Sequence, residues 1–422
     1  MNDFWRRQVA ERCGGVHFDA PATGYSFSKV LAEERELISL NRLGDKSSAL
    51  LALSIADPRW KMSADAMRAA MDYYELSDDA TRYTDNNGIA GTHQRIAQVI
   101  AKRYLAAGHI DERWVQYSPG AIKRLLAEYI PSAFFDCNLE LVFPTPGYGV
   151  IKDKINRRGA KVTDLPLQDS ATGWILPIKQ ISFSPDAEKN FVYINAPHNP
   201  TGMDFDEEDW DRLIEWAIDN DVVMIVDEAY VDIRYSENGT SILNIPGWDQ
   251  CCIVLQSISK GWSATGTRFG WVVANPTVIA VLRNVMDVKD SGGFGPTLAA
   301  GLYCLEHPEL ALATRDEYLS LHRKLFNVLG QAGFDSRMPA GGLCQLTPAP
   351  RAVNGRSFET VVDCAKWFRE TLRVSLMHYE VQNKWYLRWA VTTPAVKMCE
   401  LPDENAVMDE LGRRLQSVKF SF

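Results

Sequence analysis

Three short apolar segments follow one another in this chain, and each ends in a cluster of polar residues. The segments span residues 191–194, 222–226 and 253–255. Their apolar character predicts buried β-strands, and the helical stretch at 207–219 separates the first two. Such alternation predicts a mainly parallel sheet with helices on both faces. Ligands of these sheets bind outside the carboxyl ends of the strands, so we expect the three polar clusters to converge.

The cluster after the third strand contains a lysine and an arginine at a fixed spacing. Lys260 ends the run Ser257-Ile258-Ser259-Lys260, and Arg268 follows eight residues later. An amine at this position can form a Schiff base with an aldehyde, and the two serine hydroxyls with the guanidinium can bind a phosphate dianion. An aldehyde cofactor that carries a phosphate needs these groups. A lysine at a strand end can equally be solvated, so the motif alone leaves both interpretations open.

The clusters after the first two strands add an asparagine, an aspartate and a tyrosine. Asn199 begins Asn-Pro-Thr-Gly, and Asp227 stands three residues before Tyr230. An acidic partner such as Asp227 favours the protonated ring nitrogen that makes pyridoxal phosphate an electron sink. Asn199 and Tyr230 can donate to the phenolate oxygen of that ring. Taken singly, these groups can be a turn, a helix cap and a core tyrosine; their joint order with Lys260 favours the cofactor site.

With these motifs the chain resembles the class I and II aminotransferases, the fold type I group of pyridoxal-phosphate enzymes, from about residue 83 to residue 388. The resemblance implies an α/β fold with a large domain, in which a mainly parallel seven-stranded sheet is sandwiched by helices, and a smaller α+β domain. We expect the cofactor-binding domain at 51–300, and an N-terminal arm with the small domain at 1–50 and 301–422. The family residues that contact the cofactor correspond to Asn199, Asp227, Tyr230, Lys260 and Arg268.

The resemblance also implies roles for residues outside these strands. The turn Gly120-Ala121-Ile122 opens an expected helix at 123–129, and its backbone amides would cradle the phosphate. The ring of Tyr148 would stack on the pyridine ring of the cofactor.

The resemblance also implies roles for one residue that binds the substrate and one that reaches the partner subunit. Arg388 interrupts an apolar strand and would bind the α-carboxylate of the amino acid, with an internal salt bridge as the alternative. Tyr83 would reach the phosphate of the neighbouring subunit, which implies a homodimer with shared active sites. Thr92-His93 stands where the family usually has Leu-Arg, so a plain turn near Tyr83 is the alternative.

Two segments depart from the family pattern, so the type of reaction is not fixed by the resemblance. Ile55-Ala56-Asp57-Pro58 replaces a Gly-x-Pro loop beside the substrate, and Gly341-Gly342-Leu343-Cys344 lacks the usual aromatic residue. The resemblance implies an aminotransferase acting between an L-amino acid and a 2-oxo acid, both unspecified. A lyase, a cyclising synthase or an oxidase acting on an amino acid is the alternative. A non-catalytic regulator is disfavoured, because Lys260 is retained and no basic DNA-binding extension is visible.

The composition limits the possible partners and the cellular location of the protein. Of the 422 residues, 46% are apolar and 23% charged, as in ordinary soluble proteins. The net charge of −9 argues against nucleic acid and anionic membranes as partners, and no apolar run is long enough to span a membrane. The first residues do not form a secretory signal. Eight scattered cysteines predict reduced thiols in a cytoplasmic protein, and the histidine and cysteine spacings predict no metal site.

Overall fold

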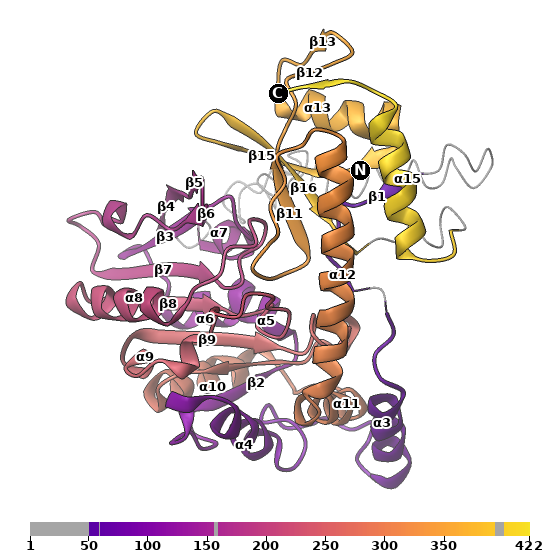
Figure 1. Cartoon of the computed structure of the whole chain (residues 1–422). Helices are drawn as coiled ribbons and strands as arrows, with labels where there is room; N and C mark the ends of the chain where they lie inside the picture. Colours follow the sequence, from indigo (N-terminus) through magenta and orange to yellow (C-terminus); the bar gives the residue numbers. More distant parts are fainter. Residues whose placement is uncertain (1–49, 59, 156–158, 393–400) are drawn as a thin grey trace, which may run out of the picture.

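Of the five sheets in the described part of the chain, one of seven strands and one of three strands form the two main parts of the fold, as Figure 1 shows for the computed structural model. The structure describes residues 50–58, 60–155, 159–392 and 401–422; the expected helix at 30–38 lies outside them. Within this described part, no helix combines the length and the apolar character that a membrane span requires.

The large sheet has seven strands in the spatial order β2-β10-β9-β8-β7-β3-β4. They are β2 (Val115–Ser118), β3 (Leu139–Thr145), β4 (Lys161–Pro166), β7 (Lys189–Asn195), β8 (Val222–Asp227), β9 (Cys252–Ser257) and β10 (Gly270–Val273). All pairs from β9 to β4 are parallel, whereas β10 runs antiparallel to both β9 and β2. The predicted mainly parallel sheet is confirmed, and its three polar-ended strands are immediate neighbours.

Alternate residues of the central strands pack on opposite faces of the large sheet. Val192 and Ile194 of β7 lie in one apolar cluster, while Phe191 and Tyr193 lie in another. Both faces are therefore buried, as expected for parallel strands covered by helices. The covering helices include α4 (Thr92–Arg103), α8 (Glu207–Asp219), α10 (Pro276–Lys289) and α11 (Gly295–Glu306).

Helix α8 shows why such segments become helical. The Asp206 side chain caps its first turn by accepting from the amide of Asp209. Its buried residues, Trp210, Leu213, Ile214 and Ala217, recur at the spacing of one helical face. The helix predicted at 207–219 is confirmed.

The helix expected at 123–129 is part of a longer helical stretch that consists of three consecutive pieces. Helix α5 (Ala121–Arg124) is followed by a π-helical turn over Leu125–Tyr129 and then by α6 (Ile130–Phe134). Pro131 has no amide hydrogen to donate to the carbonyl of Ala127, four residues earlier, so a regular α-helical ladder cannot continue there. Residues 123–129 are therefore helical as expected, but the second part of this segment is a π-helical turn.

The smaller sheet has the antiparallel order β11-β16-β15. Its strands are β11 (Cys344–Pro348), β15 (Met377–Val381) and β16 (Lys384–Ala390). Helices α12 (Glu309–Gln331), α13 (Val361–Trp367) and α15 (Glu404–Gln416) accompany it, and Figure 1 shows α12 extending from this sheet down to α11. Strand β1 (Leu51–Ala52) pairs with β14 (Val374–Ser375), so the chain passes the small sheet before it enters the large one. The domain boundaries given above stay a prediction.

Gly270 lets β10 pass close to the turn at Ala121. A Cβ atom on Gly270 would lie 2.9 Å from the Cα of Ala121 and 3.0 Å from the carbonyl oxygen of Gln256. Because both are backbone atoms, we expect Gly270→Ala to lower the free energy of unfolding by about 1–3 kcal/mol, the usual cost of overpacking. Gly266→Ala is the matched control, since a Cβ there meets no atom within 4 Å. Urea unfolding followed by circular dichroism measures both, and equal stability of the two variants would contradict the close contact.

Candidate active site

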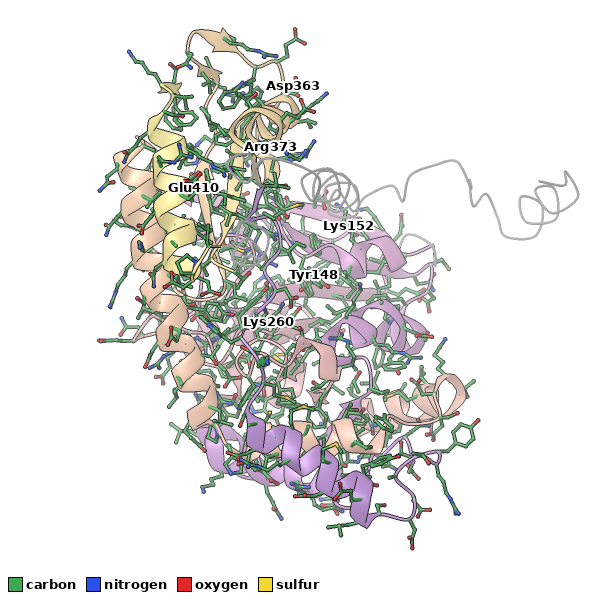
Figure 2. The ribbon with its side chains drawn as sticks, turned by 90° about the vertical axis from the view of Figure 1, so that its right-hand side faces the viewer. Tyr148, Lys152, Lys260, Asp363, Arg373 and Glu410 are labelled. Atoms are coloured by element: carbon green, nitrogen blue, oxygen red, sulfur yellow. The ribbon has the colours of Figure 1, made fainter. Side chains whose placement is uncertain are left out.

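A cavity of about 850 Å³ lies at the carboxyl ends of β7, β8 and β9 and reaches the small sheet. Figure 2 shows Tyr148 and Lys260 near the middle of the molecule, where this cavity lies. The structure brings most of the predicted site residues together in its lining: Ala121, Ile122, Tyr148, Asn199, Asp227, Tyr230, Ser257, Ser259, Lys260, Arg268 and Arg388. Parallel pairing explains this convergence, because Asn195 and Asp227 are register partners at the strand ends.

Two predicted residues lie elsewhere. Gly120 is outside the cavity lining, but its carbonyl accepts a hydrogen bond from Arg268 at 2.7 Å. Tyr83 is 89% exposed and does not line the cavity of its own chain. The segment after it is fixed, since the Thr84 hydroxyl donates to the carbonyl of Gly293 at 2.5 Å and Asn86 donates to Asp287 at 3.1 Å.

Lys260 projects from the turn after β9 toward a loop near the N-terminus of the described chain. Its Nζ donates to the carbonyl oxygen of Ala56 at 2.7 Å. Burial lowers the pKa of Lys260 to about 8, and the nearby charge of Asp57 partly opposes this shift. A larger share of the amine is therefore neutral near pH 7 than for an exposed lysine, which makes it a better nucleophile and proton acceptor.

The Ala56 loop, one of the departures from the family pattern, is held by a threonine of the small-sheet region. The amide of Asp57 donates to the Thr392 hydroxyl at 3.0 Å, and that hydroxyl donates to the carbonyl of Ile55 at 2.8 Å. Asp57 and Ala56 both line the cavity. The position of the acceptor for Lys260 is thus set by a residue more than three hundred positions away.

Asp227 is a buried carboxylate on the floor of the cavity. Tyr193 donates its hydroxyl to Oδ2 at 2.7 Å, and the amide of Ala229 donates to Oδ1 at 3.0 Å. Burial raises the pKa of Asp227 to about 6, while these two hydrogen bonds act in the opposite direction. Asp227 is consequently ionised above about pH 6 and can pair with a buried cation.

The other end of the cavity is rich in hydrogen-bond donors. The Arg268 guanidinium lies beside the turn at Gly120 and also donates to the carbonyl of Thr265 at 2.7 Å. Arg268 and Ala121 both have positive φ, at 56° and 52°. Ser257 is buried next to them, with its hydroxyl accepting from the amide of Ser259 at 3.4 Å. A guanidinium, hydroxyls and backbone amides together form a setting for an anion.

Asn199 connects the two sheets across the cavity. Its Nδ2 lies 3.5 Å from the Tyr230 hydroxyl, and its Oδ1 accepts from Arg388 Nη1 at 3.1 Å. Arg388 also donates to the carbonyl of Ser54. Arg388 is 5% exposed on the central strand of the small sheet, so its guanidinium is held at the edge of the cavity.

Sequence reasoning missed several of these partners. Tyr193 was interpreted only as part of an apolar strand, and Ser54 and Tyr379 carried no motif. The His93 departure has a structural explanation: the ring is buried, its Nε2 accepts from the amide of Tyr117 at 3.2 Å, and burial lowers its pKa to about 4. For the bond between Tyr193 and Asp227, the one sign in the sequence was a tyrosine hydroxyl inside a buried strand, which needs a hydrogen-bond partner.

Comparison with known proteins identifies the class of enzyme. The family model for aminotransferase class I and II matches residues 48–379, and the chain belongs to this family. It is 27% identical to the LL-diaminopimelate aminotransferase of Methanocaldococcus jannaschii over 100% of both chains. The fold is similar to an aspartate aminotransferase mutant of Thermus thermophilus, with TM-score 0.78, 18% identity, and 93% of this chain and 97% of that one covered. Another similar fold is the substrate-bound BacF structure from Bacillus subtilis, with TM-score 0.78, 19% identity, and coverage of 92% and 95%.

These findings confirm the predicted family, fold class and type of enzyme, an aminotransferase. The likeness to solved structures concerns the fold alone, because the identities are low.

The charge of Asp57 provides a test of the Lys260 environment. Because this charge raises the pKa of Lys260, Asp57→Asn should lower that pKa below the wild-type value. Lysine labelling of the cofactor-free protein, followed by peptide mapping across pH 6–10 or so, measures the midpoint for Lys260. Glu380→Gln removes another carboxylate of the same cavity and should shift the midpoint less. A Lys260 midpoint that is the same in Asp57→Asn and wild type would refute the assigned electrostatics.

Proposed function

We propose that this cavity binds pyridoxal 5'-phosphate and that Lys260 is the residue that carries its aldehyde. The observation that carries the proposal is the presence, in one cavity, of a buried amine, a buried carboxylate and a guanidinium. Lys260, Asp227 and Arg268 supply these groups from three different positions in the chain. We propose further that the enzyme moves an amino group between an L-amino acid and a 2-oxo acid.

The residues fit the cofactor in charge as well as in type. Asp227 is ionised above about pH 6, so it can hold the proton of the pyridine nitrogen. Tyr148 supplies an aromatic ring for one face of the pyridine, and Asn199 and Tyr230 supply donors for its phenolate oxygen. Arg268, Ser257, Ser259 and the amides at Gly120, Ala121 and Ile122 would bind the phosphate.

Different residues of this chain would perform different parts of the reaction. When bound, pyridoxal phosphate supplies an aldehyde for the amino group and a cationic ring that withdraws electrons. Arg388 binds the substrate carboxylate, and Asn199 keeps its guanidinium in place. Once a substrate amine has replaced it at the aldehyde, the freed Nζ of Lys260 would accept the proton from the α-carbon and later return a proton. Asp227, ionised above about pH 6, would balance the positive charge of the protonated ring nitrogen.

The function is tested by a half-reaction screen. Holoenzyme is mixed with single amino acids, LL-diaminopimelate first because a relative matched over its full length is named for it. We expect release of a 2-oxo acid without ammonia or oxygen uptake, measured by mass spectrometry and an oxygen electrode. Ammonia release would indicate a lyase instead, and oxygen consumption an oxidase.

The variant Lys260→Ala tests whether Lys260 is the residue that binds the cofactor aldehyde. Borohydride treatment of wild-type holoenzyme should add the mass of the reduced cofactor to the peptide containing Lys260, and the variant should gain none. Added mass on another lysine in the wild type would overturn the assignment.

We also propose a homodimer in which Tyr83 reaches the site of the neighbouring subunit. Tyr83 is almost fully exposed although the residues after it are held by hydrogen bonds. Helix α3 (Ala64–Leu76) supports an interface, because Met67, Met71 and Tyr74 are each 50% exposed and recur along one helical face.

The dimer is tested by sedimentation and by cofactor titration. The holoenzyme should sediment at twice the chain mass of 47.4 kDa. Tyr83→Phe should remain dimeric and bind pyridoxal phosphate about tenfold more weakly, the cost of one hydrogen bond to a charged group. A wild-type monomer, or a Tyr83→Phe dimer with unchanged cofactor affinity, would contradict the shared site.

We place the enzyme in the cytoplasm. The described cysteines Cys137, Cys251, Cys252, Cys304, Cys344 and Cys364 are all free thiols. Free, mostly buried thiols are typical of a reducing compartment, which supports this location.

A further inference from the structure

The hairpin of β15 and β16 fixes one tyrosine next to the substrate-facing arginine. Val381 pairs with Lys384, and the two residues between them, Gln382 and Asn383, have φ of 50° and 64°. Positive φ at both central residues is the signature of a two-residue hairpin turn that leaves no freedom in the strand register. The register therefore follows directly from the turn.

This register places Tyr379 diagonally beside Arg388. Met377 pairs with Arg388, and Tyr379, two residues further along β15, projects from the same face of the sheet. Diagonal neighbours of this kind lie within reach of aromatic and long side chains. Both residues line the cavity, and against the effect of burial, which raises the pKa of the Tyr379 phenol, the positive charge of Arg388 acts to lower it.

The contacts of Arg388 include two uncharged oxygens, the amide oxygen of Asn199 and the carbonyl of Ser54. The phenol of Tyr379 lies diagonally across the hairpin on the same face of the sheet. Burial raises the pKa of Tyr379, so its hydroxyl keeps its hydrogen at neutral pH. A phenol that accepts from an arginine through a lone pair still has its own O–H to donate.

We propose that Tyr379 is a positioning and substrate-binding residue of the carboxylate site: it orients Arg388 and donates its hydroxyl to the bound carboxylate. The neutral phenol preserves the positive charge of the arginine, which an acidic partner would offset. The inference rests on the proposed role of Arg388 in binding the α-carboxylate of the substrate. It adds a second, uncharged ligand for that carboxylate from the neighbouring strand.

A pair of small probes that differ only by the carboxylate tests this proposal. 2-Methylalanine has an α-carboxylate but no α-hydrogen, so it can bind without reacting further, and isopropylamine is its decarboxylated counterpart. Both are titrated into holoenzyme while the visible absorbance of the cofactor is followed. Tyr379→Phe should weaken 2-methylalanine about tenfold, which equals about 1.4 kcal/mol, and leave isopropylamine within about twofold.

Tyr386→Phe is the matched control. Tyr386 is the register partner of Tyr379, but its hydroxyl donates to Asp169 at 3.1 Å and it does not line the cavity. This variant should bind both probes as the wild type does. Equal weakening of both probes in Tyr379→Phe, or no weakening of either, would overturn the proposal.

Arg388→Lys separates this inference from the function on which it rests. If Arg388→Lys weakens 2-methylalanine selectively and Tyr379→Phe does not, only the role of Tyr379 is wrong. If neither variant discriminates between the probes, the carboxylate site itself has been misplaced and both proposals fail.

Discussion

The parallel hydrogen bonding of β7, β8 and β9 brings the ends of three strands to one edge of the large sheet. Asn199, Asp227 and Lys260, which lie at or after the ends of these strands, all line the same cavity, although they are up to about sixty positions apart in the chain. Both faces of the sheet are buried, so this edge is where polar groups can gather without being placed in an apolar core. The location of the site is thus a consequence of strand direction.

The site is completed only where the small sheet meets the large one. Lys260 bonds to the carbonyl of Ala56, and Arg388 bonds to Asn199 and Ser54. These contacts join residues that are about two hundred to three hundred positions apart. The charges are buried, so their state depends on these contacts: burial shifts the pKa of Lys260 down to about 8 and that of Asp227 up to about 6. Both shifts favour the forms with less charge.

Where the sequence departs from the family pattern, the structure shows two different kinds of residue. His93 is a buried core residue that accepts a backbone hydrogen bond, and nothing in its contacts points to the cavity. Ala56 and Asp57, in contrast, lie in the cavity beside Lys260. From the sequence both departures looked alike, because position in a motif does not say whether a side chain faces the core or the ligand.

The mainly parallel sheet, helix α8 and the convergence of Asn199, Asp227 and Lys260 could be predicted from the sequence, because they depend on local apolar periodicity and on the short-range direction of the chain. The π-helical turn before Pro131 and the hydrogen bond from Tyr193 to Asp227 could not be predicted in the same way. Nor could the position of Tyr379 beside Arg388, which requires the hairpin register and the docking of the small sheet. The sequence by itself determined which chemical groups the enzyme has. Only the tertiary structure decided which of them touch, because those contacts join elements that are distant in the chain and whose approach no local pattern encodes.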